Sequence, residues 1–329
     1  MTNIPIVDPP PAPSAGNVVL YGEETISGVR LMAKFPNGDT TEVASEGSEP
    51  GQDSMLIWLS DMHIGSPGGT QARVTALVTH LLGLSPDGVI DTGDCKHNYG
   101  TTTGGELDNY KTWVRSTLPW LVSTGAPYPI LPGNHDEVYD YASPVGMPTD
   151  WSLWDPRMWS APYRWRADWS QAHIRFLAIH SYIKHENPLL GFFSVDQADI
   201  DWLEDELAVL PSGWKAIVCS HAPADPVFGN YIHDSLGGAN LRTLLAVNAG
   251  KIAAYLNGHR HGNMENAALN GIRHMNGPST SYTQGNGYGA YTRIEYTAAT
   301  NSIKFRVFYA ANGFTEYPTS LYTPVTINL

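Results

Sequence analysis

The sequence has few cysteines, few positive charges and no long apolar run. Its two cysteines, Cys95 and Cys219, exclude a framework of disulfides. Lys and Arg total 19 against 32 Asp and Glu, a net charge of -13. This balance argues against a nucleic-acid partner, because affinity for polyphosphate rests on cationic side chains. No charged segment followed by an apolar one opens the chain, and no apolar run could cross a bilayer. We therefore expect no signal peptide, no transmembrane segment and no membrane partner.

Five short polar blocks stand out along the chain. They are Asp61-Met62-His63, Gly93-Asp94, Gly133-Asn134-His135-Asp136, Ser220-His221 and Gly258-His259-Arg260-His261. All but the third follow a strongly apolar run typical of a buried strand, and α/β proteins place ligands at such strand ends. Together the blocks offer seven oxygen or nitrogen ligands, enough for two metal ions if one carboxylate is shared. A site of that kind activates water and binds a phosphoryl group.

The spacing within the blocks predicts how the ligands are presented. Asp61 and His63 are two residues apart, so at an extended strand end both would point to one face, and the same holds for His259 and His261. The mixture of His, Asp and Asn ligands suits Mn, Fe, Zn or Ni, and does not suit Ca alone. Each cysteine lies beside a block on a strand-like segment, so we expect buried free thiols that point away from the ligands. A thiolate ligand is the alternative.

The five blocks, in this order, resemble the calcineurin-like metallophosphoesterase superfamily over about residues 55–310. The resemblance implies which residues hold the metals. The first ion would be held by Asp61, His63 and His261, the second by Asn134, His221 and His259, and Asp94 would bridge the two. It also implies that His135 faces the substrate, as a general acid or as a phosphate contact.

The chain departs from many of these relatives after Asp94. They carry an Asp that orients the catalytic His and an Arg that grips phosphate, where this chain has His97 and Asn98. Asp136 becomes the candidate partner of His135, and His97 would either face the substrate side of the centre or lie in solvent. The missing Arg argues against a protein-serine/threonine phosphatase. Purple acid phosphatases have a Tyr ligand where His97 stands, so the phosphodiesterase-type branch is favoured.

Apolar periodicity predicts alternating strands and helices, and therefore an α/β fold over residues 51–329. The resemblance implies a four-layer α/β/β/α sandwich. We expect strands at 55–59, 88–91, 128–131, 216–219 and 252–256, an antiparallel pair at 288–296 and 302–309, and helices at 70–82, 106–118 and after a capping box at Ser194-Val195-Asp196-Gln197.

Two regions lie outside this pattern. Residues 1–50 read as a Pro-rich leader, a small β unit with a hairpin turn at Pro36-Asn37-Gly38-Asp39, and a linker. The unit resembles short β modules near the ends of phage tail proteins, which would make the chain virion-associated rather than cytoplasmic. A family-specific decoration is the alternative. Residues 137–172 are rich in Trp and Tyr, and would form either a cap over the metals or a satellite core.

These observations favour a metal-dependent phosphoric ester hydrolase with two divalent or trivalent ions. A metal-bridging hydroxide would attack a phosphodiester, or the phosphomonoester of a small substrate. A metal-dependent nuclease and a non-catalytic binding module that keeps the fold are the alternatives. Arg157, Arg164 or Arg166 could replace the missing Arg, whereas Arg260 lies between two ligands and should point away from them. The sequence leaves a homo-oligomer and association with a cell envelope open.

Overall fold

The computed structural model describes most of the chain outside three long segments. The described residues are 19–25, 28–34, 40–42, 54–64, 71–84, 86–95, 131–135, 164–183, 193–262, 265–280, 290–309, 314–316 and 322–329. Among them, no helix combines the length and the apolar character that crossing a membrane requires.

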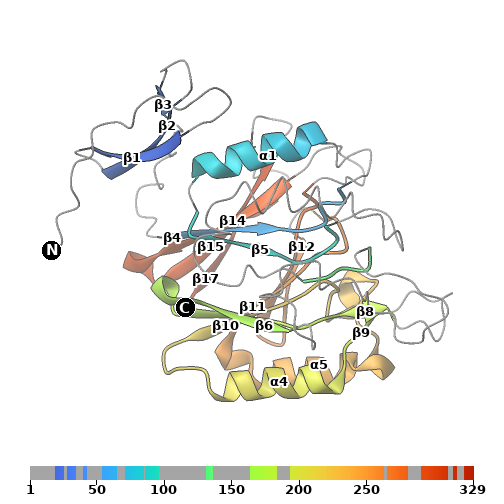
Figure 1. Cartoon of the computed structure of the whole chain (residues 1–329). Helices are drawn as coiled ribbons and strands as arrows, with labels where there is room; N and C mark the ends of the chain where they lie inside the picture. Colours follow the sequence, from blue (N-terminus) through green and yellow to red (C-terminus); the bar gives the residue numbers. More distant parts are fainter. Residues whose placement is uncertain are drawn as a thin grey trace.

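Two six-stranded mixed sheets form the main body (Figure 1). The first has the order β16-β15-β14-β4-β5, with β17 paired to β15. Its strands are β4 (Ser54–Leu59), β5 (Gly88–Asp91), β14 (Ala290–Thr297), β15 (Ser302–Tyr309), β16 (Thr315–Glu316) and β17 (Val325–Asn328). Strands β4 and β5 are parallel, and β14 runs antiparallel to β4.

The second sheet has the order β12-β13-β11-β10-β7-β6. Its strands are β6 (Trp165–Trp169), β7 (Ile174–Ala178), β10 (Lys215–Ser220), β11 (Ile252–Asn257), β12 (Glu265–Leu269) and β13 (Ile272–Asn276). The four central strands are parallel, and the two edge strands are antiparallel. Parallel strands need crossover connections, and the helices α4 (Gln197–Ala208) and α5 (Gly238–Val247) supply them.

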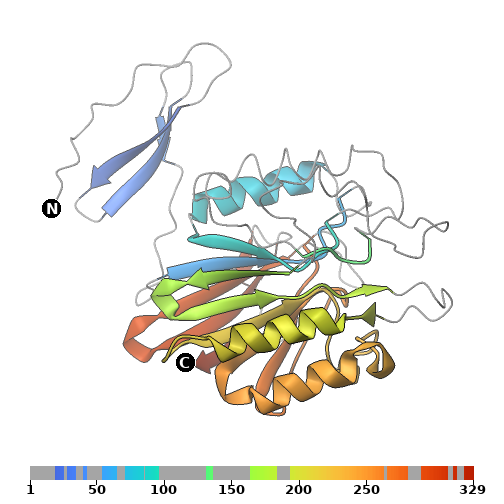
Figure 2. The same ribbon diagram turned by 60° about the horizontal axis from the view of Figure 1, so that its bottom comes forward.

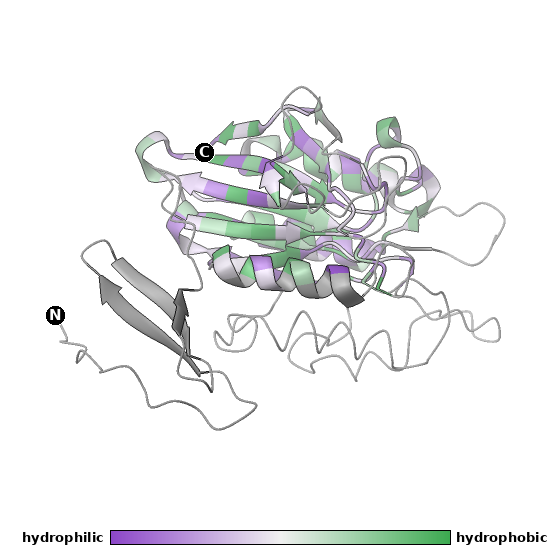
Figure 3. Ribbon diagram, turned by 90° about the horizontal axis from the view of Figure 1, so that it is seen from above, coloured by the Kyte–Doolittle hydropathy of each residue, from purple (hydrophilic) through white to green (hydrophobic). Residues whose placement is uncertain are grey.

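The sheets face each other across one apolar core, to which Trp58 and Ile294 contribute from the first sheet and Phe176 and Leu256 from the second. A second apolar cluster packs α4 and α5 on the outer face of the second sheet. The helix α1 (Gln71–Leu84) lies along the other side of the first sheet (Figures 1 and 2). Figure 3 shows apolar residues along the central strands. Every residue of β4 is buried, as expected for a strand covered on both faces.

The remaining elements are short. A separate antiparallel sheet contains β1 (Val19–Thr25), β2 (Gly28–Lys34) and β3 (Thr40–Glu42), and a hairpin contains β8 (Tyr182–Ile183) and β9 (Phe193–Ser194). Single 3-10 turns occur at Ser170–Ala172, Pro226–Phe228, Asp234–Leu236, Ala249–Lys251 and Ala298–Thr300.

Two sequence-based expectations need correction. The capping box is wrong, because α4 begins after Asp196 rather than Ser194, and Asp196 makes no capping hydrogen bond with its side chain. The aromatic insert also ends earlier than residue 172. Residues 165–169 form β6, and Trp169 packs in the core between the sheets. The expected helix at 106–118, residues 137–163 of the insert and all but the last residue of the strand at 128–131 lie outside the described residues.

Candidate metal centre

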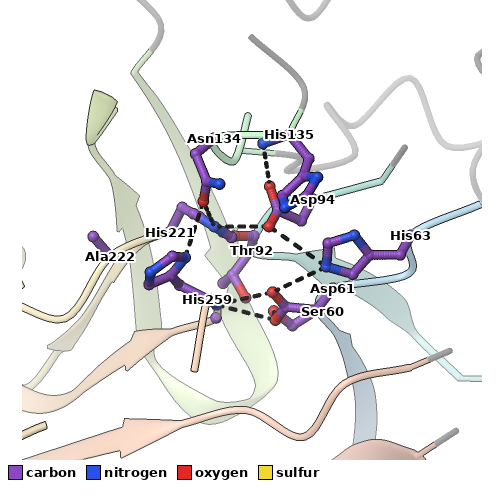
Figure 4. Close-up of polar contacts among 12 residues, drawn as sticks. Ser60, Asp61, His63, Thr92, Asp94, Asn134, His135, His221, Ala222 and His259 are labelled. Carbon is purple, nitrogen blue, oxygen red and sulfur yellow. Dashed lines mark hydrogen bonds and ion pairs between the residues drawn. The ribbon is translucent and has the colours of Figure 1, made fainter. Parts of the chain in front are cut away.

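The polar blocks converge because four strands end at the same edge of the two sheets. Asp61 and Asp94 follow β4 and β5 of the first sheet, whereas His221 and His259 follow β10 and β11 of the second. Their side chains point toward one another (Figure 4). Asp61, Asp94 and His221 are at most 1% exposed, so the edge holds a dense cluster of ionisable groups with little water around it.

The first group of candidate ligands contains Asp61, His63, Asp94 and His261. The two imidazole Nε2 atoms of His63 and His261 are 3.0 Å apart. His261 Nε2 lies 3.2 Å from Asp61 Oδ1, and His63 Nε2 lies 3.6 Å from Asp94 Oδ2. His261 comes from the second sheet and the other three from the first, so this group spans both sheets.

The second group contains Asp94, His221 and His259, with Asn134 beside them. The amide oxygen of Asn134 lies 3.1 Å from His221 Nε2 and 2.9 Å from His259 Nδ1. His221 Nδ1 lies 2.7 Å from the carbonyl oxygen of Thr92. This contact fixes the ring orientation and leaves Nε2 to serve as the ligand atom.

Asp94 belongs to both groups through a single oxygen. Its Oδ2 is 3.6 Å from His63 Nε2 and 3.3 Å from His221 Nε2. Its Oδ1 accepts a hydrogen bond of 2.7 Å from the backbone N–H of His135. The block containing Gly133 passes so close that a Cβ at Gly133 would lie 2.2 Å from Asp94 Oδ1, and only glycine can occupy that position.

The expectation that the paired ligands lie on extended strand ends is wrong. Asp61, His63, Asp94, His259 and His261 all have positive φ values, between 41° and 70°. Left-handed backbone costs a residue with a side chain about 1–2 kcal/mol, and such strain clusters at functional sites. Three hydrogen bonds hold the strained turns, since the N–H groups of residues 61, 63 and 64 donate to the carbonyl oxygens of residues 93, 94 and 95, at 2.8–2.9 Å.

The donor geometry fits transition-metal ions. Two ligand atoms that are each about 2.0–2.2 Å from one ion, at angles near 90–110°, lie roughly 3–3.5 Å apart. The separations within both groups are close to that range. The set of imidazole, carboxylate and amide donors also suits borderline ions. The residues therefore form a candidate binuclear centre of Asp and His ligands, in which Asp94 belongs to both ligand groups.

The electrostatics of the cluster favour cations. Burial raises the pKa of Asp94, but His221 and His63 outweigh this effect and hold it well below its usual value. Burial lowers the pKa of His221, whereas the carboxylate of Asp94 raises it to about 10. Burial also lowers the pKa of His63 to about 4 and that of His259 to about 3. The carboxylates thus remain ionised and attract positive charge, and metal uptake would displace protons from the cluster.

His135 lies at the rim of the first group. Its ring contacts that of His63 edge to face, with centroids 4.5 Å apart, and it is partly exposed. This position leaves the ring able to meet a bound substrate. His97 and Asp136, the two expected auxiliary residues, lie outside the described residues.

Neither cysteine belongs to the candidate centre. Both are buried free thiols, as expected. Cys95 Sγ lies 3.5 Å from a carboxylate oxygen of Asp91, and Cys219 packs in the core between the sheets, where burial raises the pKa of its thiol.

Residues 276–280, here called the strap, were not identified from the sequence. The strap begins at the last residue of β13 and joins the ends of both sheets beside Asp61. Its Gly277 N–H donates to the carbonyl oxygen of Asn257, at 2.7 Å. Thr280 exchanges two hydrogen bonds with the backbone of Ser60, at 2.8 and 3.2 Å, and Ser279 Oγ donates to the carbonyl oxygen of Asp61 at 2.9 Å. No sequence motif marks the strap, because its role depends on contacts about 220 residues away.

We expect Thr280→Val to weaken the first metal group selectively. Valine keeps the shape but leaves the buried N–H of Ser60 without its acceptor, which costs about 1–3 kcal/mol of stability. Losing such supporting contacts typically lowers metal affinity about 10–100-fold. Elemental analysis after dialysis against a weak chelator should find close to one ion per chain instead of two.

Thr292→Val is the matched control for this experiment. Thr292 is fully buried on β14, and its hydroxyl has no hydrogen-bond partner among the described residues. This variant should keep both ions. Full metal content in Thr280→Val would show that the strap does not support the centre.

Two of the arginines considered as phosphate clamps are bound elsewhere. Arg164 bonds to Asp199 and to the carbonyl oxygen of Ala198, and Arg166 forms an ion pair of 3.0 Å with Glu206. Their partners all lie on α4, on the outer face of the second sheet. Arg157 is outside the described residues.

The sequence and the fold are similar to those of known proteins. Residues 55–263, more than half of the chain, match the family model described as calcineurin-like phosphoesterase. No curated protein matches the sequence. Among solved structures, a dimetal phosphatase from Danio rerio aligns with a TM-score of 0.56 and 10% identity, over 84% of this chain and 99% of that one. A predicted phosphoesterase from Streptococcus pneumoniae TIGR4 aligns with a TM-score of 0.37 and 14% identity, over 83% and 96%. The first of these likenesses shows the mixed α/β fold.

Proposed function

Since the chain belongs to the calcineurin-like phosphoesterase family, we propose that it is a two-metal hydrolase that prefers phosphodiesters to phosphomonoesters. The observation that carries the proposal is the shared oxygen of Asp94, which lies within 3.6 Å of a histidine in each ligand group. Two ions held there would supply a nucleophilic water at neutral pH and stabilise the charge that develops on the phosphoryl oxygens.

The chain's own residues would then bind and orient the substrate. One ion would be held by Asn134, His221 and His259, and the other by Asp61, His63 and His261. His135, at the rim, donates a proton to the oxygen of the leaving group. The strap and the hydrogen-bonded turns around Asp61 keep the ligand atoms fixed during the reaction, so little reorganisation is needed.

The preference for diesters follows from the missing clamp. A monoester carries two charges near neutral pH and gains from an arginine that binds it through two hydrogen bonds. The family's arginine position is Asn98 here, and Arg164 and Arg166 are engaged by α4. A diester carries one charge, which two metal ions and one proton donor can stabilise without an arginine.

The test compares bis(p-nitrophenyl) phosphate with p-nitrophenyl phosphate on the metal-loaded full chain. A charged hydrogen bond is worth about 1.5–3 kcal/mol, so the diester should have a kcat/KM about 10-fold higher or more. Removal of the metals with a chelator should abolish both activities. A clear preference for the monoester would overturn the diesterase proposal.

The same preparation distinguishes the alternatives. Cleavage of single-stranded DNA with a kcat/KM above that of the small diester would favour a nuclease. A protein that holds two ions and cleaves none of these substrates would favour a non-catalytic binding module.

The fold also supports a more specific architecture. The resemblance implies a four-layer α/β/β/α sandwich, and α1 on one side with α4 and α5 on the other are consistent with it.

A further inference from the structure

Arg260 is an exposed cation beside the candidate centre. It lies in sequence between His259 and His261, yet its guanidinium makes no hydrogen bond or ion pair with any other residue in the described parts of the chain. Other arginines of the domain are engaged, such as Arg242 with Asp234 and Arg306 with Glu316. In a chain of net charge -13, an arginine beside the candidate centre that has no acidic partner among the described residues indicates a binding role.

The side chain of Arg260 reaches the loop that follows β10. A Cβ built on Gly229 would lie 3.3 Å from Arg260 Nη1, so the guanidinium rests against this glycine. Gly229 has a φ of 66°, in the left-handed region where a side chain is disfavoured. The glycine thus leaves room for the guanidinium and keeps one side of it uncovered.

This loop is anchored next to the second ligand group. The N–H of Ile232 donates to the carbonyl oxygen of Pro223 at 2.9 Å, and Ile232 pairs with Phe193 in a β-bridge. The ring of Phe193 contacts the ring of His259, with centroids 4.6 Å apart. The loop that Arg260 contacts is therefore linked through Ile232 and Phe193 to His259 of the second ligand group.

We propose that Arg260 binds a second anionic group of the substrate, next to the phosphoryl group held at the metal centre. The guanidinium is a planar fork that matches a carboxylate or a further phosphate. Because the guanidinium rests against Gly229 in the loop after β10, it would meet a neighbouring substituent and not the scissile phosphoryl group. The physiological substrate would then carry at least two anionic groups. This inference rests on the proposed function, because it assumes that a phosphoryl group occupies the centre.

Binding of two non-hydrolysable probes tests the inference without turnover. Calorimetry on the metal-loaded protein would compare phenylphosphonate with 4-carboxyphenylphosphonate, which differ by one anionic group. The wild type should bind the carboxylated probe about 5-fold more tightly, the order expected for a partly exposed ion pair. Arg260→Gln should lose this advantage and leave the affinity for phenylphosphonate unchanged, and Arg260→Lys should retain part of it.

Arg166→Gln is the matched control, since Arg166 is an exposed arginine whose partner lies on α4. It removes the same charge and should keep the full advantage. The inference would be overturned, and the proposed function left intact, if the wild type bound both probes equally well. The same holds if Arg260→Gln still bound the carboxylated probe more tightly. If phenylphosphonate itself does not bind, the centre does not take phosphoryl groups, and the proposed function fails together with the inference.

Discussion

Asp94→Ala should reduce kcat/KM by at least about 10³-fold and leave fewer than two ions per chain. One oxygen of Asp94 faces both ligand groups, so its loss removes a ligand from each. Metal ions contribute several kcal/mol of transition-state stabilisation, and each 1.4 kcal/mol is a factor of ten in rate. Elemental analysis and turnover of bis(p-nitrophenyl) phosphate would measure both effects.

Two further variants separate charge from folding. Asp94→Asn keeps the oxygen that accepts the hydrogen bond from His135 N, but lacks the negative charge, so it should lose activity while folding normally. Asp201→Ala removes an exposed carboxylate on α4 and should behave as the wild type. Two tightly held ions in an active Asp94→Ala protein would contradict the shared role of Asp94.

His135→Ala should slow turnover about 10²–10⁴-fold on diesters with alkyl leaving groups, the usual effect of losing a general acid. The variant should keep both ions, because His135 reaches Asp94 through its backbone N–H and not through its ring. With a nitrophenolate leaving group, which needs no proton, the loss should be much smaller. Parallel kcat measurements on the two substrate types would reveal the difference.

His173→Asn serves as the control for this variant. His173 is an exposed histidine that precedes β7, at the edge opposite the centre, and its left-handed backbone tolerates Asn. It should leave both rates unchanged. An equal loss on both substrate types in His135→Ala would assign His135 to phosphate binding instead of proton transfer.

Much of this architecture could be predicted because its signals are local. The apolar runs before Asp61, Asp94, His221 and His259 predict buried strands, and those strands exist as β4, β5, β10 and β11. Strands of that kind end at one edge, so the meeting of their polar residues also follows from the sequence.

The details of the centre depend on non-local contacts, which a single sequence does not reveal. The turns at Asp61 and His63 are left-handed although neither residue is glycine, because hydrogen bonds to residues 93 and 94 hold them. The strap is another such case, since Ser279 and Thr280 meet Asp61 and Ser60 only after the sheets have packed. The boundary of β6 was missed because its Trp-rich sequence continues that of the preceding insert.

Each ligand group contains residues from both sheets, so bound metal would affect the stability of the folded chain. Ions held by Asp61 from one sheet and His261 from the other would fasten the two sheets together at their common edge. Binding that is restricted to the folded state adds to its stability according to the free concentration of the ligand. The stability of the folded protein would then increase with the free metal concentration. Loss of metal would lower the amount of folded protein as well as its activity.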